Sequence, residues 1–324
     1  MIPSGLCVLA MGGNSLIDPR GPLDVENQFE IARNAVRPIA DLLARGAQLV
    51  ITHGNGPQVG FMQLRSELAS THLHEVPLDS LVADSQGSLG YMIQLALRES
   101  LARRGASRPI ATIVTEVEVD PHDPALAHPT KPIGRFYTVV EAERLRRERG
   151  WQMVEDSQRG YRRVVPSPLP LRIVQLGIVR ELVRAGVVVI TCGGGGIPVV
   201  QEGPGRVQGI EAVIDKDHAS ALLARGLNAP NLIITTGIDV IYKDFLSYHP
   251  KPLHRTDLAE LREMQADGQF PPGSMGPKVQ AAIDFIEAGG ELAIICRPEA
   301  VHEALAGRAG TRIYRTLPPE SQDE

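Results

Sequence analysis

The chain has 324 residues, of which 43% are hydrophobic, and its formal net charge is −5 at pH 7. This length exceeds the size at which one hydrophobic core usually stops growing, so we expect either one large α/β unit with a lid or two fused lobes. The negative charge argues against non-specific nucleic-acid binding. It does not exclude binding of a nucleotide, because the cations close to the site determine whether a nucleotide binds. We expect no membrane span, since the apolar runs are too short, and no signal peptide.

The three cysteines indicate a reducing compartment. Cys7, Cys192 and Cys296 are far apart in sequence, and each lies within or beside an apolar run. This odd number and wide spacing favour buried thiols over a disulfide framework, so we expect a cytoplasmic protein. No spacing of Cys and His resembles a zinc site.

Strand-like and helix-like segments alternate along the chain. In chain order we expect a strand over 6–11, a helix over 25–45, a strand over 48–52, a helix over 81–104, a strand over 110–119, a loop over 120–136, a helix over 139–149, an irregular or short-stranded segment over 151–170, a helix over 171–185, a strand over 187–191, a helix over 217–227, a strand over 232–235, a helix over 277–288, a strand over 292–295 and a helix over 299–305. This alternation predicts an α/β fold, a three-layer αβα sandwich with a mainly parallel central sheet.

Residues 120–168 break the alternation, and we interpret them as a protruding lid subdomain. They contain prolines and charges but show little regular pattern. We therefore expect a single domain over 1–324. It would comprise an N-terminal lobe over about 1–185, which carries the lid, and a C-terminal lobe over about 186–324.

Glycine-rich turns follow three of the predicted strands. They are Gly12-Gly13, the segment from Gly54 to Gly56, and 193–196. Glycine lets backbone N–H groups approach an anion, and the following helix adds the positive end of its dipole. The segments 50–57 and 189–196 also resemble each other. The likeness can arise by chance, because turns from strand to helix often need glycine. It can also arise because two similar strand ends face one ligand crevice, and both explanations can hold together. The sequences typical of P-loop enzymes, dinucleotide-binding folds and serine hydrolases are absent.

Lysine is rare in this chain, and three lysines occupy conspicuous positions. The sequence contains five lysines among its 33 basic residues. Lys131, Lys216 and Lys278 lie in segments rich in Gly, Pro and Asp, whereas Lys243 and Lys251 are consistent with chance survival. Lysine is a compact, mobile point charge, which suits a group that follows a moving phosphoryl unit. We therefore predict that the first three contact phosphate.

The segment Asp215-Lys216-Asp217 precedes a predicted helix and allows two interpretations. In the simpler one, Asp217 caps the helix and Lys216 is solvated. In the other, Lys216 contacts a phosphate while a neighbouring carboxylate positions the lysines or a hydrated Mg²⁺. The two are compatible, because a helix N-terminus is also where a phosphate binds.

Seven short segments occur in a specific order over about residues 6–313. They read LAMGGNSL, THGNGPQVG, PTKPIG, VVPSP, CGGGGIPVV, EAVIDKDHASALLA and PPGSMGPKVQAAIDFIEAGG. Together they resemble carbamate kinases, a family within the amino-acid kinase superfamily. Other superfamily members usually place a lysine in the first strand. Here that strand has none, and the resemblance implies that Lys131 on the lid takes its role.

The resemblance implies an ATP-dependent kinase that interconverts carbamoyl phosphate plus ADP and ATP plus carbamate, with Mg²⁺, often in arginine catabolism. It implies that the catalytic residues are Lys131, Lys216, Lys278 and Asp217. It implies that carbamate or the transferring phosphoryl group is bound by Gly12, Gly13, Asn14, Gly54 and Asn55. It implies that the C-terminal lobe binds the nucleotide through Asp215, Lys216, Gly237, Tyr242, Ser274, Met275 and Lys278. No residue is assigned as a direct metal ligand.

The resemblance also implies a homodimer. From the net charge and the short apolar runs we expect no nucleic-acid or membrane partner. Two other functions stay open at this point. One is a non-catalytic nucleotide- or anion-binding protein on the same fold, because a fold alone does not determine function. The other is a related kinase whose acceptor is a different small acid.

Overall fold

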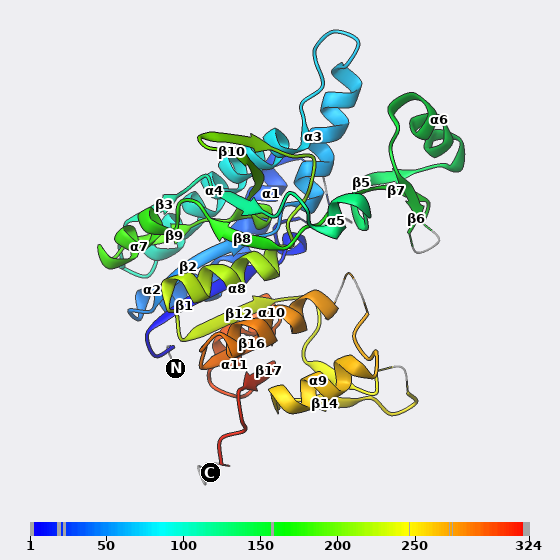
Figure 1. Ribbon diagram of the computed structural model, residues 1–324. Helices are drawn as coiled ribbons and strands as arrows, with labels where there is room; N and C mark the ends of the chain where they lie inside the picture. Colours follow the sequence, from blue (N-terminus) through cyan, green and yellow to red (C-terminus); the bar gives the residue numbers. More distant parts are fainter. Residues whose placement is uncertain are drawn as a thin grey trace.

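An eight-stranded sheet forms the centre of the protein (Figure 1). The structure is a computed structural model, and it describes residues 3–17, 21, 24–156, 159–245, 247–271, 273 and 275–319. From one edge to the other its strands are β15 (Arg255–Asp257), β17 (Thr311–Tyr314), β16 (Leu292–Cys296), β12 (Asn231–Thr235), β1 (Leu6–Met11), β2 (Gln48–His53), β9 (Val188–Ile190) and β3 (Ile110–Thr112). The strands from β16 to β3 run parallel, whereas β17 is antiparallel to β16. Strands from both predicted lobes therefore share one sheet.

Helices cover both faces of this sheet. One face packs against α7 (Leu176–Arg184), α8 (Lys216–Leu227), α9 (Leu258–Ala266) and α10 (Met275–Glu287). The other packs against α1 (Val25–Ala35), α2 (Arg37–Ala44), α4 (Leu78–Ala102) and α11 (Val301–Leu305). Successive side chains of a strand point to opposite faces, so Val8 and Ala10 enter the first core while Leu9 and Met11 enter the second. The predicted three-layer αβα sandwich is confirmed.

Two predicted elements are each divided in the structure. The helix expected over 25–45 is split into α1 and α2 at Val36, because Pro38 lies in the first turn of α2 and cannot continue a preceding helix. The strand expected over 110–119 is also two strands. β3 belongs to the central sheet, whereas β4 (Glu116–Val119) belongs to a four-stranded sheet with β11 (Arg206–Gly209), β10 (Ile197–Gly203) and β8 (Pro170–Ile173).

A small subdomain extends from the body within the segment that was predicted to leave the sheet (Figure 1). It consists of the antiparallel strands β5 (Lys131–Tyr137), β7 (Tyr161–Val165) and β6 (Met153–Glu155), with helix α6 (Val139–Arg149). Its own apolar cluster contains Tyr137, Ala142, Leu145 and Met153. We call residues 131–165 the protruding subdomain. Its strands are short and charged, which explains why the sequence alone did not reveal their pairing.

The remaining elements connect these layers. They are α3 (Gly56–Ala69), α5 (Pro124–Ala127), the hairpin β13 (Ile241–Lys243) and β14 (Lys251–Leu253), and the 3₁₀ turns η1 (Gly13–Leu16), η2 (Gly193–Gly195) and η3 (Pro298–Ala300). Of these, α3 packs directly against β5 of the protruding subdomain. Throughout the described residues, every helix is too short or too polar to cross a membrane.

Candidate active site

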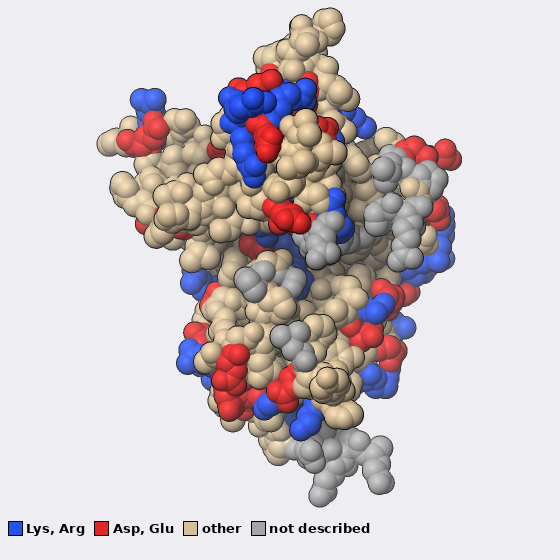
Figure 2. Space-filling view, turned by 90° about the vertical axis from the view of Figure 1, so that its right-hand side faces the viewer, with Lys and Arg blue, Asp and Glu red and all other residues tan. Residues whose placement is uncertain are grey.

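A cavity of about 480 Å³ lies where the parallel strands of the central sheet end. Gly12 follows β1, Gly54 follows β2 and Thr235 ends β12, and all three residues line it. Open α/β sheets bind ligands at this edge, outside the carboxyl ends of the strands. Figure 2 looks toward this side of the molecule and shows Lys or Arg atoms inside a hollow between its upper and lower parts.

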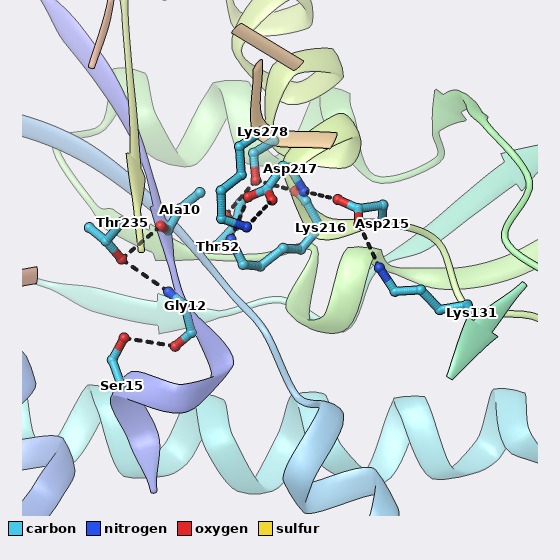
Figure 3. Close-up of polar contacts among 11 residues, drawn as sticks. Ala10, Gly12, Ser15, Thr52, Lys131, Asp215, Lys216, Asp217, Thr235 and Lys278 are labelled. Carbon is cyan, nitrogen blue, oxygen red and sulfur yellow. Dashed lines mark hydrogen bonds and ion pairs between the residues drawn. The ribbon is translucent and has the colours of Figure 1, made fainter. Parts of the chain in front are cut away.

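Three lysines that are distant in sequence converge on this cavity. Lys131 begins β5, Lys216 begins α8 and Lys278 lies in the first turns of α10. Their ammonium groups meet two carboxylates (Figure 3). Lys131 Nζ lies 2.6 Å from Asp215 Oδ2, Lys216 Nζ lies 2.5 Å from Asp217 Oδ1 and Lys278 Nζ lies 2.9 Å from Asp217 Oδ2. These three ammonium groups and two carboxylates together carry one positive charge, which suits an anionic ligand. Glu299 also lines the cavity, but its carboxylate is paired with Arg297 at 3.8 Å.

The start of α8 explains how the two aspartates differ. Asp215 is the N-cap residue of α8, and its side chain accepts a hydrogen bond from Asp217 N at 2.9 Å. The interpretation of Asp217 as the cap is therefore wrong. The Asp217 side chain, only 2% exposed, instead bridges Lys216 and Lys278. Asp215 acts as the cap and as the partner of Lys131 at the same time.

The neighbouring lysines keep the two aspartates ionised. Burial acts to raise the pKa of Asp217, but the charges of Lys216 and Lys278 outweigh it and hold that pKa below its ordinary value. Burial lowers the pKa of Lys216, as does the charge of Lys278, while Asp217 opposes the shift. The pKa of Asp215 is also lowered, because the Lys131 ammonium outweighs the effect of burial. Both carboxylates therefore act to stabilise the charged form of Lys216.

The glycine turns bring backbone close to backbone. A Cβ atom on Gly54 would lie 2.7 Å from Gly13 N, so only glycine allows the turns after β1 and β2 to approach this closely. Gly194 has a positive φ of 67°, and a Cβ there would lie 2.1 Å from Asn55 Nδ2. The Asn55 amide in turn donates to Ser85 Oγ at 2.8 Å. The two similar segments of the sequence thus meet at one cavity, since Asn55 and Gly194 both line it.

Most of the predicted site residues line this cavity, namely Gly12, Gly13, Gly54, Asn55, Lys131, Asp215, Lys216, Asp217, Gly237 and Lys278. Tyr242 lies in the β13–β14 hairpin opposite Pro252, and Met275 begins α10; the structure places both outside the cavity lining. Their contact with a nucleotide stays a prediction. Ser274 and the side chain of Asn14 fall outside the described part of the chain.

Thr235 lines the cavity but was not among the residues predicted from the sequence. Its Oγ1 accepts a hydrogen bond from Gly12 N at 3.0 Å and donates one to Ala10 O at 3.1 Å (Figure 3). It therefore fixes the first glycine turn against the neighbouring strand. A signal was available, because Thr235 is the polar residue that ends a predicted apolar strand. Pro298 and Glu299, after β16, also line the cavity and were not predicted.

His53 lies directly beneath the second glycine turn. The ring is buried, and its Nδ1 lies 3.1 Å from Gly54 O. Burial lowers the pKa of His53 to about 4, and the charge of Lys216 acts in the same direction. At neutral pH this imidazole is uncharged, so it adds no further positive charge to the lysine cluster.

The carboxylates of Asp215 and Asp217, beside the lysines, determine how a metal ion would be held there. Among the described residues, no group of three or more His, Cys, Asp or Glu side chains could hold a metal ion. Mg²⁺ that accompanies a nucleotide usually keeps several waters and uses phosphates with one or two carboxylates, rather than an all-protein cage. Asp215 and Asp217 fit that limited role through water, because lysines occupy their nearest oxygens.

Comparison with known proteins gives a consistent result over nearly the whole chain. The profile described as "Amino acid kinase family" matches residues 5–297. The carbamate kinase-like protein YahI of Escherichia coli is 45% identical over 314 residues, 96% of this chain and 99% of that protein. The carbamate kinase of Pyrococcus furiosus is 46% identical over 308 residues, 94% of this chain and 98% of that protein.

Solved structures show the same likeness. A carbamate kinase from Giardia lamblia bound to AMP-PNP superposes with a TM-score of 0.89 at 39% identity, covering 97% of this chain and 99% of that chain. An N-acetylglutamate synthase from Neisseria gonorrhoeae superposes with a TM-score of 0.59 at 15% identity and shares the fold alone.

Proposed function

The chain belongs to the amino acid kinase family, and we propose that it transfers a phosphoryl group reversibly between ATP and carbamate, so that carbamoyl phosphate and ADP are in equilibrium with carbamate and ATP. The observation that carries this proposal is the convergence of Lys131, Lys216 and Lys278 on one cavity floored by glycine turns. The curated relatives support the choice of carbamate, since several of them are named carbamate kinases at 42% identity or more over nearly their full length.

Phosphoryl transfer requires little covalent work from a protein. It requires cations around the moving group and in-line placement of donor and acceptor. In the proposed reaction an oxygen of carbamate attacks the γ-phosphorus of ATP, and the bond from that phosphorus to the β,γ-bridging oxygen breaks. The bond electrons remain on ADP, so the protein has to stabilise negative charge at both ends. Positioned ammonium and N–H groups supply that stabilisation.

The residues divide this work by position. Lys216 and Lys278 approach the cavity from α8 and α10 in the C-terminal half, and we assign them to the nucleotide phosphates. Lys131 comes from the opposite side, on the protruding subdomain, and we assign it to the transferring phosphoryl group. Gly12, Gly13, Gly54 and Asn55 would surround carbamate.

The ion pairs give the lysines a defined starting arrangement. Each ammonium already has a carboxylate partner within 2.9 Å, which offsets the cost of holding a buried cation before an anion arrives. Ammonium groups have three donors on a flexible stem, so each lysine can keep its aspartate and add a phosphate oxygen. The aspartates are thus positioning residues in this proposal.

Mg²⁺ and a dimeric assembly belong to the proposal as well. When bound with the nucleotide, Mg²⁺ would neutralise part of the phosphate charge. Asp215 and Asp217 are the carboxylates that would reach its water shell. The expected homodimer has the support of the family resemblance.

The test is ATP formation from ADP and carbamoyl phosphate with Mg²⁺, followed by a coupled enzyme that consumes ATP. We expect turnover in the unaltered protein, strong loss in Lys131→Ala, and normal turnover in Lys251→Ala, since Lys251 is an exposed lysine of β14 that does not line the cavity. If ADP binds but no ATP forms, the protein is a nucleotide-binding protein and not this kinase. If N-acetylglutamate replaces carbamate as the better acceptor in the ATP-consuming direction, the assignment of carbamate is wrong.

A further inference from the structure

A chain of hydrogen bonds holds the side chain of Asn55 in one orientation. Its Nδ2 donates to Ser85 Oγ at 2.8 Å, and the Ser85 hydroxyl donates to Val82 O at 2.7 Å. A hydroxyl has only one hydrogen to donate, and a carbonyl oxygen can only accept. Ser85 Oγ must therefore accept from Asn55, so the NH₂ group of Asn55 and not its carbonyl oxygen faces Ser85.

The carbonyl oxygen of the same amide is available to a ligand. Asn55 is the N-cap residue of α3, where an asparagine oxygen ordinarily accepts from a backbone N–H of the first turn. Here the side chain forms no cap bond, and no other group of the described residues donates to Asn55 Oδ1. This oxygen is not among the fully buried atoms of the described residues that lack a partner, so it is open to the cavity that Asn55 lines.

The surroundings of the amide fix its plane. The backbone of Gly194 lies against it, since a Cβ there would lie 2.1 Å from Asn55 Nδ2 and 2.6 Å from Asn55 Oδ1. Gln86, the residue after Ser85 on α4, is also buried and donates from its Nε2 to Gly193 O at 3.1 Å. Two adjacent residues of α4 therefore hold the amide and the glycine turn on which it packs.

The surrounding charges indicate which donor this oxygen receives. The three lysines at the cavity have aspartate partners, and we assign them to phosphate. An N–H group of the acceptor molecule is then the donor left for Asn55 Oδ1. Carbamate and carbamoyl phosphate carry such a group, an NH₂ in the plane of the carbonyl. Acetate and acetyl phosphate have the same shape with a methyl group instead, which would leave the oxygen desolvated and without a partner.

We propose that Ser85 is a positioning residue that turns the Asn55 carbonyl oxygen toward the acceptor, where this oxygen selects a carbamoyl group over an acyl group by accepting an N–H hydrogen bond. The inference rests on the proposed kinase function and deepens it, because it names the atom that distinguishes carbamate from a carboxylic acid of the same size. Ser85 does not line the cavity, so it acts only through Asn55. Without Ser85 the amide can turn over while its plane stays against Gly194, and it then presents its NH₂ group to that of the substrate.

The test compares two phosphoryl donors of the same shape. Carbamoyl phosphate and acetyl phosphate are each supplied with ADP and Mg²⁺, and kcat/KM is measured for both from the ATP formed. In the unaltered protein we expect carbamoyl phosphate to be favoured at least about tenfold, since a site built around a hydrogen-bond acceptor rejects an analogue that lacks the donor. The KM of ADP is measured in parallel and should stay the same in all variants, because neither Ser85 nor Asn55 is assigned to the nucleotide.

Four variants make the test specific. Asn55→Ala should lower kcat/KM about tenfold for carbamoyl phosphate and less than about twofold for acetyl phosphate, because the methyl compound makes no use of this oxygen. Ser85→Ala should reduce the preference to a similar extent. Asn55→Ala combined with Ser85→Ala should match Asn55→Ala alone, since one residue acts through the other. Ser88→Ala, at an exposed serine of the same helix, should keep both rates.

The outcomes separate this inference from the proposed function. If the unaltered protein forms ATP from neither donor, the kinase and the inference are refuted together. Equal use of the two donors by the unaltered protein would overturn the inference and leave the kinase standing. Equal losses for both donors in Ser85→Ala would do the same, because a purely structural role lowers both rates alike. A further loss of preference in the combined variant would show that Ser85 does not act through Asn55.

Discussion

Replacement of Asp217 by asparagine removes the negative charge that lies between two lysines. In the structure the Asp217 carboxylate is 2% exposed and accepts from Lys216 at 2.5 Å and from Lys278 at 2.9 Å. The Asp217→Asn side chain has the same shape but only one acceptor oxygen, and its NH₂ group would face an ammonium. Two positive charges would then remain close together in a buried place, without the carboxylate that compensates them.

The magnitude follows from the burial and the pairing. Removal of one partner of a buried ion pair typically costs about 3–5 kcal/mol, because an uncompensated charge stays behind. Lys216 can relieve part of this by losing its proton, since burial already lowers its pKa and the attraction of Asp217 opposes that shift. We therefore expect the free energy of unfolding to fall by about 3 kcal/mol. Turnover should fall with it, because both lysines lose their positioning partner.

The assay is urea unfolding of the ligand-free protein at pH 7, compared with Asp267→Asn, an exposed aspartate at the end of α9 that should change stability by less than about 0.5 kcal/mol. A second measurement adds phosphate or ADP to both proteins. An anion gives the two unpaired lysines a new partner, so it should stabilise Asp217→Asn more than the unaltered protein.

The pH dependence gives a further check with a defined sign. The folded-state pKa of Lys216 should be lower still in Asp217→Asn. Between that pKa and the ordinary lysine value of 10.5, the unfolded chain binds a proton that the folded protein lacks, so stability should rise with pH across this window. If Asp217→Asn unfolds at the same urea concentration as Asp267→Asn and keeps its turnover, the reasoning about the lysine cluster is refuted.

Three other substitutions probe single contacts. Lys131→Ala should reduce kcat about a hundredfold or more while nucleotide affinity changes much less, because we assign this lysine to the transferring phosphoryl group. An equal loss of nucleotide affinity in a binding titration would contradict that assignment. Lys278→Arg should not restore activity, since a planar guanidinium differs from an ammonium in shape and reach, and near-normal rates would argue against a mobile point charge. In the unaltered protein, His53 should lower the free energy of unfolding as the pH falls from 6.5 to about 4. The reason is that the unfolded chain gains a proton on this ring while the folded ring stays neutral. His53→Gln should therefore reduce this loss by about 3 kcal/mol in unfolding titrations, whereas exposed His249→Gln should not.

The layered fold and the family were predictable because their signals are local. Apolar runs such as 187–191 depend on a few neighbouring residues, so most of the alternation of strands and helices is visible in the chain itself. The helix expected over 171–185 was right only in part, because β8 occupies Pro170–Ile173 and α7 begins at Leu176. The ordered motifs extended this to the carbamate kinase resemblance, which the comparisons confirm. The break at Val36 was also visible in principle, since Pro38 follows it by two positions.

The parts of the site that depend on long-range contacts were not predictable in the same way. The bridge from Asp217 to Lys278 joins residues that are 61 positions apart, and the hydrogen bond from Gly12 to Thr235 joins residues 223 positions apart. Both contacts require the actual order of strands in the sheet, which brings β12 beside β1.

The amino-acid sequence by itself determined which chemical groups are present and where most strands and helices of the central layers lie, because rotamer, turn and periodicity preferences act over a few residues. It did not reveal α3 or the strand β5, which falls in the segment expected to be a loop. The tertiary structure alone decided that Asp215 and not Asp217 caps α8, and that Asp217 holds two lysines. These properties depend on which charges meet after the sheet has assembled and how much water is excluded from them, and neither quantity is encoded in any short segment of the chain.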